Sequence, residues 1–230
     1  MQQASGHTLK AFDEDIERLR ALISQMGGLA EHAIGEAMRC LIQRDIDGAE
    51  RVVEDDKKLD ALEVETERRA VQLIALRAPM AGDLRDVVAA LKISGVVERI
   101  GDYAKNIAKR VPLLENVSKI EPLSLLPEMA RISTAMVHDV LDAFVERDAQ
   151  AAVAVCERDN AVDDFYDSIF RTLLTHMMEN PHNIGQSAHL LFVAKNLERV
   201  GDHATNIAEM VYFAATGQHM PERIRNPWKG

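Results

Sequence analysis

Acidic side chains recur at a spacing of four in two copies of one eleven-residue motif. The first copy, ERIGDYAKNIA, covers residues 98–108, and the second, ERVGDHATNIA, covers residues 198–208. Each copy keeps one Glu, one Asp and one Asn, which are Glu98, Asp102 and Asn106 in the first and Glu198, Asp202 and Asn206 in the second. Packing alone would preserve apolar periodicity and little more. The retained oxygen donors therefore indicate a site that is built twice.

A second acidic motif is also duplicated. Asp56 and Asp60 form a D-x-x-apolar-D pattern, and Asp159 and Asp163 repeat it 103 positions later. Carboxylate and amide oxygens are hard donors that suit Mg²⁺, Ca²⁺, Mn²⁺ or iron better than soft metals. One helix cannot surround an ion, so we expect each site to combine ligands from two neighbouring helices. The pattern favours a cation site in each half of the chain.

Six long amphipathic segments carry these motifs, and no strand-like alternation is sustained. The expected helices cover about 8–44, 49–77, 83–114, 127–146, 149–179 and 184–217. Three antiparallel helices with short loops can close one core. The sequence therefore predicts an all-α fold of two tandem, similar three-helix bundles, at residues 1–116 and 117–218, with a tail at 219–230.

The third and sixth helices have their acidic residues opposite an apolar seam. Their seams are Ile93, Val97, Ile100, Ala104, Ile107 and Val111 in the third, and Val193, Leu197, Val200, Ala204, Ile207 and Val211 in the sixth. At 100° per residue the acidic stripe falls on the outside of each bundle. A ferritin-like di-iron core needs inward Glu-x-x-His motifs. The one such match, Glu179 to His182, is interrupted by Pro181.

Composition narrows the function classes further. The net charge of −10 argues against a general nucleic-acid binder, which needs clustered Lys and Arg. The first ten residues lack a secretory signal, and no stretch approaches the roughly 20 apolar residues of a membrane span. Cys40 and Cys156 form no CxxC pair and fit a reduced cytoplasmic protein. No nucleophile elbow or phosphate loop occurs, so we expect no enzyme.

Two alternatives stay open at this point. Acidic residues at i and i+4 on a helix are often only a solvated face paired with Arg or Lys. The chain would then be a metal-free helical adaptor. A metal-dependent enzyme that uses the carboxylates is the other alternative, although a nucleophile and a base are missing.

The motifs together resemble those of the PhoU family of phosphate-transport regulators. The resemblance rests on the two ERxGD motifs, on the two D-x-x-apolar-D motifs and on an R-x-P-x-x-x-D-L-R segment at 77–85. It implies two similar three-helix bundles with metal clusters on their surface. The implied ligands are Glu98, Asp102, Glu198, Asp202, Asp56, Asp60, Asp159 and Asp163, with Asn106 and Asn206 in support. The candidate ions are Fe, Mn, Zn, Mg and Ca.

The resemblance also implies a regulatory role. Such a protein represses the phosphate-starvation response and phosphate uptake when phosphate is plentiful. It would connect a sensor histidine kinase to the ATPase subunit of the phosphate ABC transporter, and it would reach the membrane only through these partners. A cytoplasmic location and a homodimer are further expectations.

Overall fold

The computed structural model describes residues 2–114 and 124–221, and this part of the chain is all-α, as the sequence predicts. The first three helices are α1 (Gln2–Gln43), α2 (Ile46–Arg77) and α3 (Gly82–Ala108), followed by a short 3₁₀ turn at Pro112–Leu114. The others are α4 (Leu126–Glu146), α5 (Ala149–Glu157), α6 (Asp159–Glu179), a 3₁₀ turn at Pro181–Asn183, and α7 (Ile184–Thr216). Among the described helices, none has a stretch long and apolar enough to span a bilayer.

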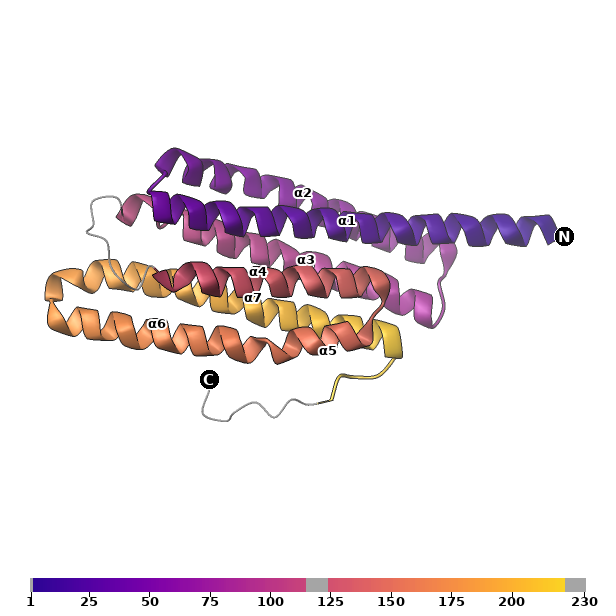
Figure 1. Cartoon of the computed structure of the whole chain (residues 1–230). Helices are drawn as coiled ribbons and strands as arrows, with labels where there is room; N and C mark the ends of the chain where they lie inside the picture. The colour runs from indigo at the N-terminus through magenta and orange to yellow at the C-terminus, as the bar shows by residue number, and fades with distance from the viewer. Residues whose placement is uncertain (1, 115–123, 222–230) are drawn as a thin grey trace.

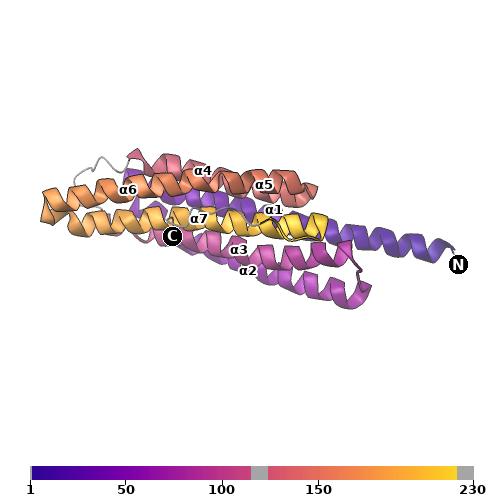
Figure 2. The ribbon, with the colours of Figure 1, turned by 90° about the horizontal axis from the view of Figure 1, so that it is seen from below.

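The helices form two bundles that lie side by side (Figure 1). α1, α2 and α3 make the first bundle, and α4, α5–α6 and α7 make the second. The bundles meet where α1 packs on α4 and where α3 packs on α7, and the view from below shows α7 beside α3 (Figure 2). The expected division at 116/117 lies outside the described residues, so that boundary stays a prediction.

Matching caps begin the second helical segment of each bundle. Asp45 accepts a hydrogen bond from the backbone N–H of Gly48 at 2.8 Å. Asp148, at the equivalent position 103 residues later, accepts from the N–H of Gln150 at 2.8 Å and of Ala151 at 3.0 Å. These bonds satisfy donors that a helix N-terminus otherwise leaves unpaired. The caps explain why both halves turn sharply at the same place.

α1 and α2 begin a few residues earlier than expected, at Gln2 and Ile46, and two further differences concern α3 and the fifth helix. α3 ends at Ala108 rather than near 114, because the ring of Pro112 clashes with a helical carbonyl four residues earlier. The expected fifth helix is divided at Arg158 into α5 and α6. There the backbone N–H of Arg158 bonds the carbonyl of Val155 at 3.1 Å. This three-residue spacing marks a local 3₁₀ tightening rather than an interruption.

The apolar seams of α3 and α7 are the centre of the fold. Every seam residue expected from the sequence is buried: Ile93, Val97, Ile100, Ala104, Ile107, Val111, Val193, Leu197, Val200, Ala204, Ile207 and Val211. On α1, a Cβ added to Gly27 would lie 2.2 Å from Leu141 Cδ1 of α4, so this glycine allows the two bundles to approach closely. α3 and α7 also pack on each other, in addition to the other helices of their own bundles.

A buried carboxylate forms ion pairs with arginines from both bundles. Asp86 near the start of α3 is buried and lies 3.3 Å from Arg20 of α1 and 3.3 Å from Arg147 after α4. Its neighbour Arg85 donates to the carbonyl of Ala214 near the end of α7 at 3.4 Å. Arg85, which ends the R-x-P-x-x-x-D-L-R segment, and Asp86 directly after it therefore connect the start of α3 to the second bundle, and Asp86 also connects it to α1.

Candidate functional site

Each acidic site lies between the second and third helical segments of its bundle, where a glycine of the repeated motif faces the second segment. A Cβ added to Gly101 would lie 2.3 Å from Leu59 Cδ2 of α2 and 3.6 Å from Asp56 Oδ1. A Cβ added to Gly201 would lie 3.4 Å from Val162 Cγ1 and 3.5 Å from the carboxylate of Asp159. At Gly101 the missing side chain is needed for the helices to approach, whereas at Gly201 a Cβ would make ordinary contacts. In both halves the two acidic motifs are neighbours in space.

In the first bundle a lysine joins the two motifs. Lys105 Nζ lies 2.5 Å from Asp56 Oδ2 and 2.8 Å from Asp102 Oδ1. Hydrogen bonds to Asp102 and Asp56 hold the pKa of Lys105 well above its ordinary value. The Asp56 side chain is only 7% exposed, so this ammonium balances a charge that has little access to water. The lysine therefore fixes one end of the acidic site.

Glu98 lies among further carboxylates at the other end of this site. Burial raises its pKa to about 7 from an ordinary 4.5, and the charges of Asp102, Glu63 and Asp60 raise it further. Burial also raises the pKa of Glu63, with Glu67 and Asp60 as added causes. Crowding of like charges disfavours ionisation. A positive charge placed here would relieve it.

Glu63 was missed by the sequence-based reasoning. It lies seven residues after Asp56 and three after Asp60 on α2, so the three side chains share one face of the helix. The helical spacing of these three carboxylates is the feature of the sequence that indicates Glu63. Glu63 has no acidic counterpart in the second half, where Tyr166 stands 103 residues later. A search for strictly repeated carboxylates could not find it.

The second bundle neutralises its site in a different way. Lys195 Nζ lies 2.7 Å from the Glu198 carboxylate, whose side chain is 15% exposed. The same ammonium lies 5.1 Å from the centre of the Tyr166 ring, within the range of a cation–π contact. Asp159 is buried beneath the motif, at 8% exposed. Where the first bundle has Lys105, the second has Thr205, whose hydroxyl donates to the Asp202 carbonyl at 2.8 Å.

The expected outward stripe is partly wrong. Asn106 and Asn206 are exposed, but Glu98, Asp102, Glu198 and Asp202 are half-buried. Asp56 and Asp159 have still less exposure. A helical wheel gives the directions of side chains around one helix and does not include the helices packed against it. The neighbouring α2 and α6 cover part of the stripe.

Oxygen donors of this kind match hard cations in chemistry. Burial is the main cause of the raised pKa of Glu98 and the neighbouring carboxylates add to it, and a cation would offset only this second contribution. Within residues 2–114 and 124–221, however, no three Asp, Glu, His or Cys side chains already converge as a cage for one ion. The carboxylates of Asp56, Asp102 and Glu198 lie against lysines instead. A cation would have to draw them away from those ammonium groups.

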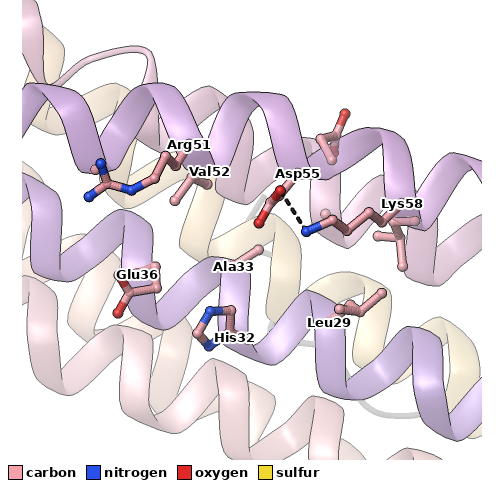
Figure 3. Close-up of a pocket in the computed structure, with 12 residues that line it drawn as sticks. Leu29, His32, Ala33, Glu36, Arg51, Val52, Asp55 and Lys58 are labelled. Atoms are coloured by element: carbon pink, nitrogen blue, oxygen red, sulfur yellow. Dashed lines mark ion pairs between the residues drawn. The ribbon is translucent and has the colours of Figure 1, made fainter.

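A small cavity of about 160 Å³ lies between α1 and α2 beside the first site (Figure 3). In the close-up, His32 and Glu36 come from α1, and Asp55 and Lys58 pair with each other along α2 at 2.7 Å. Its inner wall includes Asp56 and Gly101, so it adjoins the acidic site. Both signs of charge line it, and no single ligand class follows from them. The lining residues are Leu29, His32, Ala33, Glu36, Gly48, Arg51, Val52, Asp55, Asp56, Lys58, Leu59 and Gly101.

Equivalent residues of the two motifs meet where α3 packs on α7. The rings of Tyr103 and His203 are 5.2 Å apart in a T-shaped arrangement, and Tyr103 Oη lies 3.4 Å from His203 Nε2. Burial lowers the pKa of His203, and the charge of Arg99 lowers it further. At either side, Arg85 contacts Ala214 and Arg110 stacks on Phe192, so α3 and α7 run antiparallel. The two acidic sites are thus related by an approximate two-fold axis through this contact.

Comparison with known proteins gives one consistent result. The family model described as "PhoU domain" matches residues 23–111 and 126–211, one match in each bundle. The chain is 57% identical to the "Phosphate-specific transport system accessory protein PhoU homolog" of Zymomonas mobilis, over 98% of this chain and 96% of that protein. It is 47% identical to the protein of the same description from Caulobacter vibrioides, over 93% and 94% of the two chains.

Solved structures agree with this. The crystal structure of PhoU from Pseudomonas aeruginosa superimposes with a TM-score of 0.86 at 34% identity, covering 90% of this chain and all of that one. The crystal structure of the phosphate transport system regulatory protein PhoU from Streptococcus pneumoniae gives a TM-score of 0.85 at 26% identity, with coverage of 92% and 100%.

Proposed function

This chain belongs to the PhoU family, and we propose that it is a negative regulator of phosphate-starvation signalling and of phosphate uptake. The proposal rests on one observation above the others, the match along nearly the whole chain to a protein described as an accessory of the phosphate-specific transport system. Both bundles take part in that match. We place the protein in the cytoplasm, where it would act by docking rather than by turnover.

The proposed partners are the ATPase subunit of the phosphate ABC transporter and a sensor histidine kinase. The shape suits a connector, because α1 has 42 residues and is therefore roughly 60 Å long. The side-by-side bundles offer separate long faces (Figures 1 and 2). Docking changes kinase output only if the protein binds two kinase states with unequal affinity. We propose that it favours the state that removes phosphate from the response regulator.

We further propose that the acidic sites bind iron or divalent cations. The residues that would hold them are Glu98, Asp102, Asp56 and Asp60 in the first bundle, and Glu198, Asp202, Asp159 and Asp163 in the second. Asn106 and Asn206 would contribute from the exposed side. A bound cation would supply positive charge that links the second helical segment to the third. No reaction step is assigned to it.

A specific observation favours the metal-free alternative. Lys105 lies between Asp56 and Asp102, and Lys195 lies on Glu198, so ammonium groups already neutralise part of each site. In this second candidate function the carboxylate–lysine network only holds the helices together, and the protein is a helical adaptor. The regulatory role is common to both candidates.

Deletion of the gene tests the regulatory proposal. We expect alkaline phosphatase, as a reporter of the starvation response, to be expressed in high phosphate after deletion and repressed again by the wild-type gene. Unchanged repression in the deletion strain would refute it. Co-purification of the tagged chain with the transporter ATPase and with the kinase then tests each partner separately.

Elemental analysis tests the cation proposal. We expect the freshly purified chain to contain metal and the double variant Asp102→Ala, Asp202→Ala to lose most of it, since one ligand is removed from each site. Absence of metal from both proteins would support the metal-free adaptor, and equal metal in both would refute Asp102 and Asp202 as ligands.

A further inference from the structure

We propose that inorganic phosphate binds at the start of α3, between the guanidinium groups of Arg85 and Arg147, and that its hydroxyl donates to the buried carboxylate of Asp86. The inference deepens the regulatory function proposed above, and it rests on that function for the role of phosphate as a signal. Arg85 ends the R-x-P-x-x-x-D-L-R segment, which lies outside the two acidic sites.

Two arginines from different bundles converge on Gly82, the first residue of α3. A Cβ added to Gly82 would lie 3.6 Å from Arg147 Nη2 and 3.8 Å from Arg85 Nη2. The space over this glycine therefore faces the ends of two guanidinium groups. Planar guanidinium groups bind phosphate oxygens through paired N–H donors. Because Arg85 is on α3 and Arg147 directly follows α4, an anion here would contact both bundles.

The two guanidinium groups retain donors for a ligand. Arg85 donates from Nε to the carbonyl of Ala214 at 3.4 Å, and it forms no ion pair within the part of the chain that the structure describes. Arg147 has one ion pair among the described residues, from Nη2 to Asp86 Oδ1 at 3.3 Å. The remaining N–H groups of both side chains can therefore donate to an anion.

Positive charge exceeds buried negative charge at this place. Asp86 is the buried carboxylate, and Arg20 lies 3.3 Å from its Oδ2. Glu17, which pairs with Arg20, and Asp83 in the first turn of α3 are both exposed, so water screens their charges. The N-terminus of α3 adds a partial positive charge and has no side-chain cap. This balance favours an anion as the ligand.

Asp86 selects phosphate among the anions. It is 6% exposed, and its Oδ1 points toward Arg147 Nη2, the atom that also faces Gly82. This oxygen is buried and accepts no hydrogen bond from a described residue, which costs free energy. Inorganic phosphate keeps a hydroxyl at neutral pH and can donate it to this oxygen, whereas sulfate has no proton to donate. A phosphate monoester has mostly lost its proton above its second pKa of roughly 6.

The start of α7 lacks this arrangement. The acidic motifs of α3 and α7 correspond at a distance of 100 residues, and at that distance Arg85 and Asp86 correspond to Gly185 and Gln186. A Cβ added to Gly185 would meet no described atom within 4 Å. The packing that the two bundles share therefore does not require an arginine and a buried carboxylate at this position. We expect one phosphate site per chain.

Equilibrium dialysis of radiolabelled inorganic phosphate against the full chain, at neutral pH and constant ionic strength, tests the proposal. We expect saturable binding of one phosphate per chain. Arg85→Gln and Arg147→Gln should each weaken binding by about ten-fold, since each removes a charge-assisted hydrogen bond. Arg131→Gln is the matched control, because it removes the same charge near the other end of α4 and should leave binding unchanged.

Gly82→Ala separates loss of the ligand from loss of the fold. Its Cβ makes ordinary contacts with the two guanidinium groups, so the helix accepts it, but the methyl group occupies the space proposed for phosphate. Phosphate binding should be lost, while the temperature of unfolding in phosphate-free buffer should be unchanged or higher. Gly185→Ala, the change at the start of α7, should leave phosphate binding unchanged. Binding that survives Gly82→Ala and both arginine variants overturns the site.

Competition identifies the anion. We expect unlabelled phosphate to displace the label at least about ten-fold better than sulfate or glycerol 2-phosphate, and Asp86→Asn to remove this preference. Equal competition by sulfate or by the ester in the wild-type chain overturns inorganic phosphate as the selected ligand. Far-UV circular dichroism verifies that each variant is folded. The Gly82→Ala result stands even if Asp86→Asn does not fold.

The outcomes separate this inference from the regulatory proposal. No saturable phosphate binding to the folded wild-type chain overturns the inference and leaves the regulatory proposal, which alkaline phosphatase expression after gene deletion tests. Unchanged repression in the deletion strain refutes the regulatory proposal and the signalling role of phosphate, but not its binding. A Gly82→Ala chain that loses phosphate binding and still represses alkaline phosphatase in high phosphate overturns the signalling role alone.

Discussion

Replacing Glu98 by Gln should stabilise the metal-free protein, and more so at high pH. The pKa of Glu98 is raised from 4.5 to about 7, with burial as the main cause. A carboxyl whose pKa rises on folding favours the folded state only while it is protonated. That contribution is complete below about pH 4.5 and is lost as the pH rises through about 7. At pH 8 the wild-type chain therefore folds with an unfavourable charge that the amide removes.

The size of the effect follows from the shift. Each pKa unit corresponds to about 1.4 kcal/mol, so the full shift would correspond to about 3 kcal/mol at pH 8. Glu98 is only half-buried, and solvent screening reduces this to about 1–2 kcal/mol. At pH 5 most of the difference disappears, because the folded-state carboxyl is then protonated. At pH 5 we expect Glu98→Gln to raise the free energy of unfolding by roughly a few tenths of a kcal/mol.

Urea unfolding in the presence of a chelator, at pH 5 and pH 8, measures these free energies. Glu198→Gln is the matched control, since it removes the partner of Lys195 and should give no gain at pH 8. The reasoning is refuted if Glu98→Gln stabilises equally at both pH values, or if it destabilises the chain at pH 8.

Two further perturbations probe contacts between helices. Gly101→Ala should destabilise the chain by about 1–2 kcal/mol in urea unfolding, because its Cβ would overlap the buried Leu59. The matched Gly201→Ala has room and should gain about 1 kcal/mol from helix propensity, so equal effects would contradict the contact geometry. The hydrogen bond to Glu31 raises the pKa of His138. His138→Gln should therefore lower the free energy of unfolding by about 0.5 kcal/mol or less below pH 6.5, and should leave it unchanged once the pH exceeds the raised pKa of His138. A lower free energy of unfolding that persists at pH 9 would contradict this.

Local patterns were sufficient to predict most of the fold. The apolar seams of α3 and α7 have helical spacing, and every residue in them is buried. Asp148, a residue type that favours helix N-caps, lies directly before the expected helix 149–179 and caps α5. The early end of α3 has a signal in the sequence, Pro112, which the expected helix 83–114 did not take into account. The 3₁₀ tightening at Arg158 was not predicted, because a helix pattern does not by itself reveal where hydrogen bonding changes. Both differences concern boundaries rather than the existence of a helix.

The candidate site was predictable only in part. Repetition identified the acidic positions, but the Lys105–Asp56 contact joins residues 49 positions apart and depends on how α2 packs on α3. Glu63 was hidden because its counterpart, Tyr166, is not acidic. A repeat reveals what two halves share. What makes them unequal is visible only when the helices are placed together.

The meeting of Tyr103 with His203 has a consequence for what each half can contribute to the contact. Surfaces that join through equivalent positions are those of a symmetric pair, so the two bundles have the geometry of an isologous dimer within one chain. In a pair of identical subunits any residue at the axis must face its own copy. A single chain with two unlike halves is free of that restriction, so a phenol can lie against an imidazole.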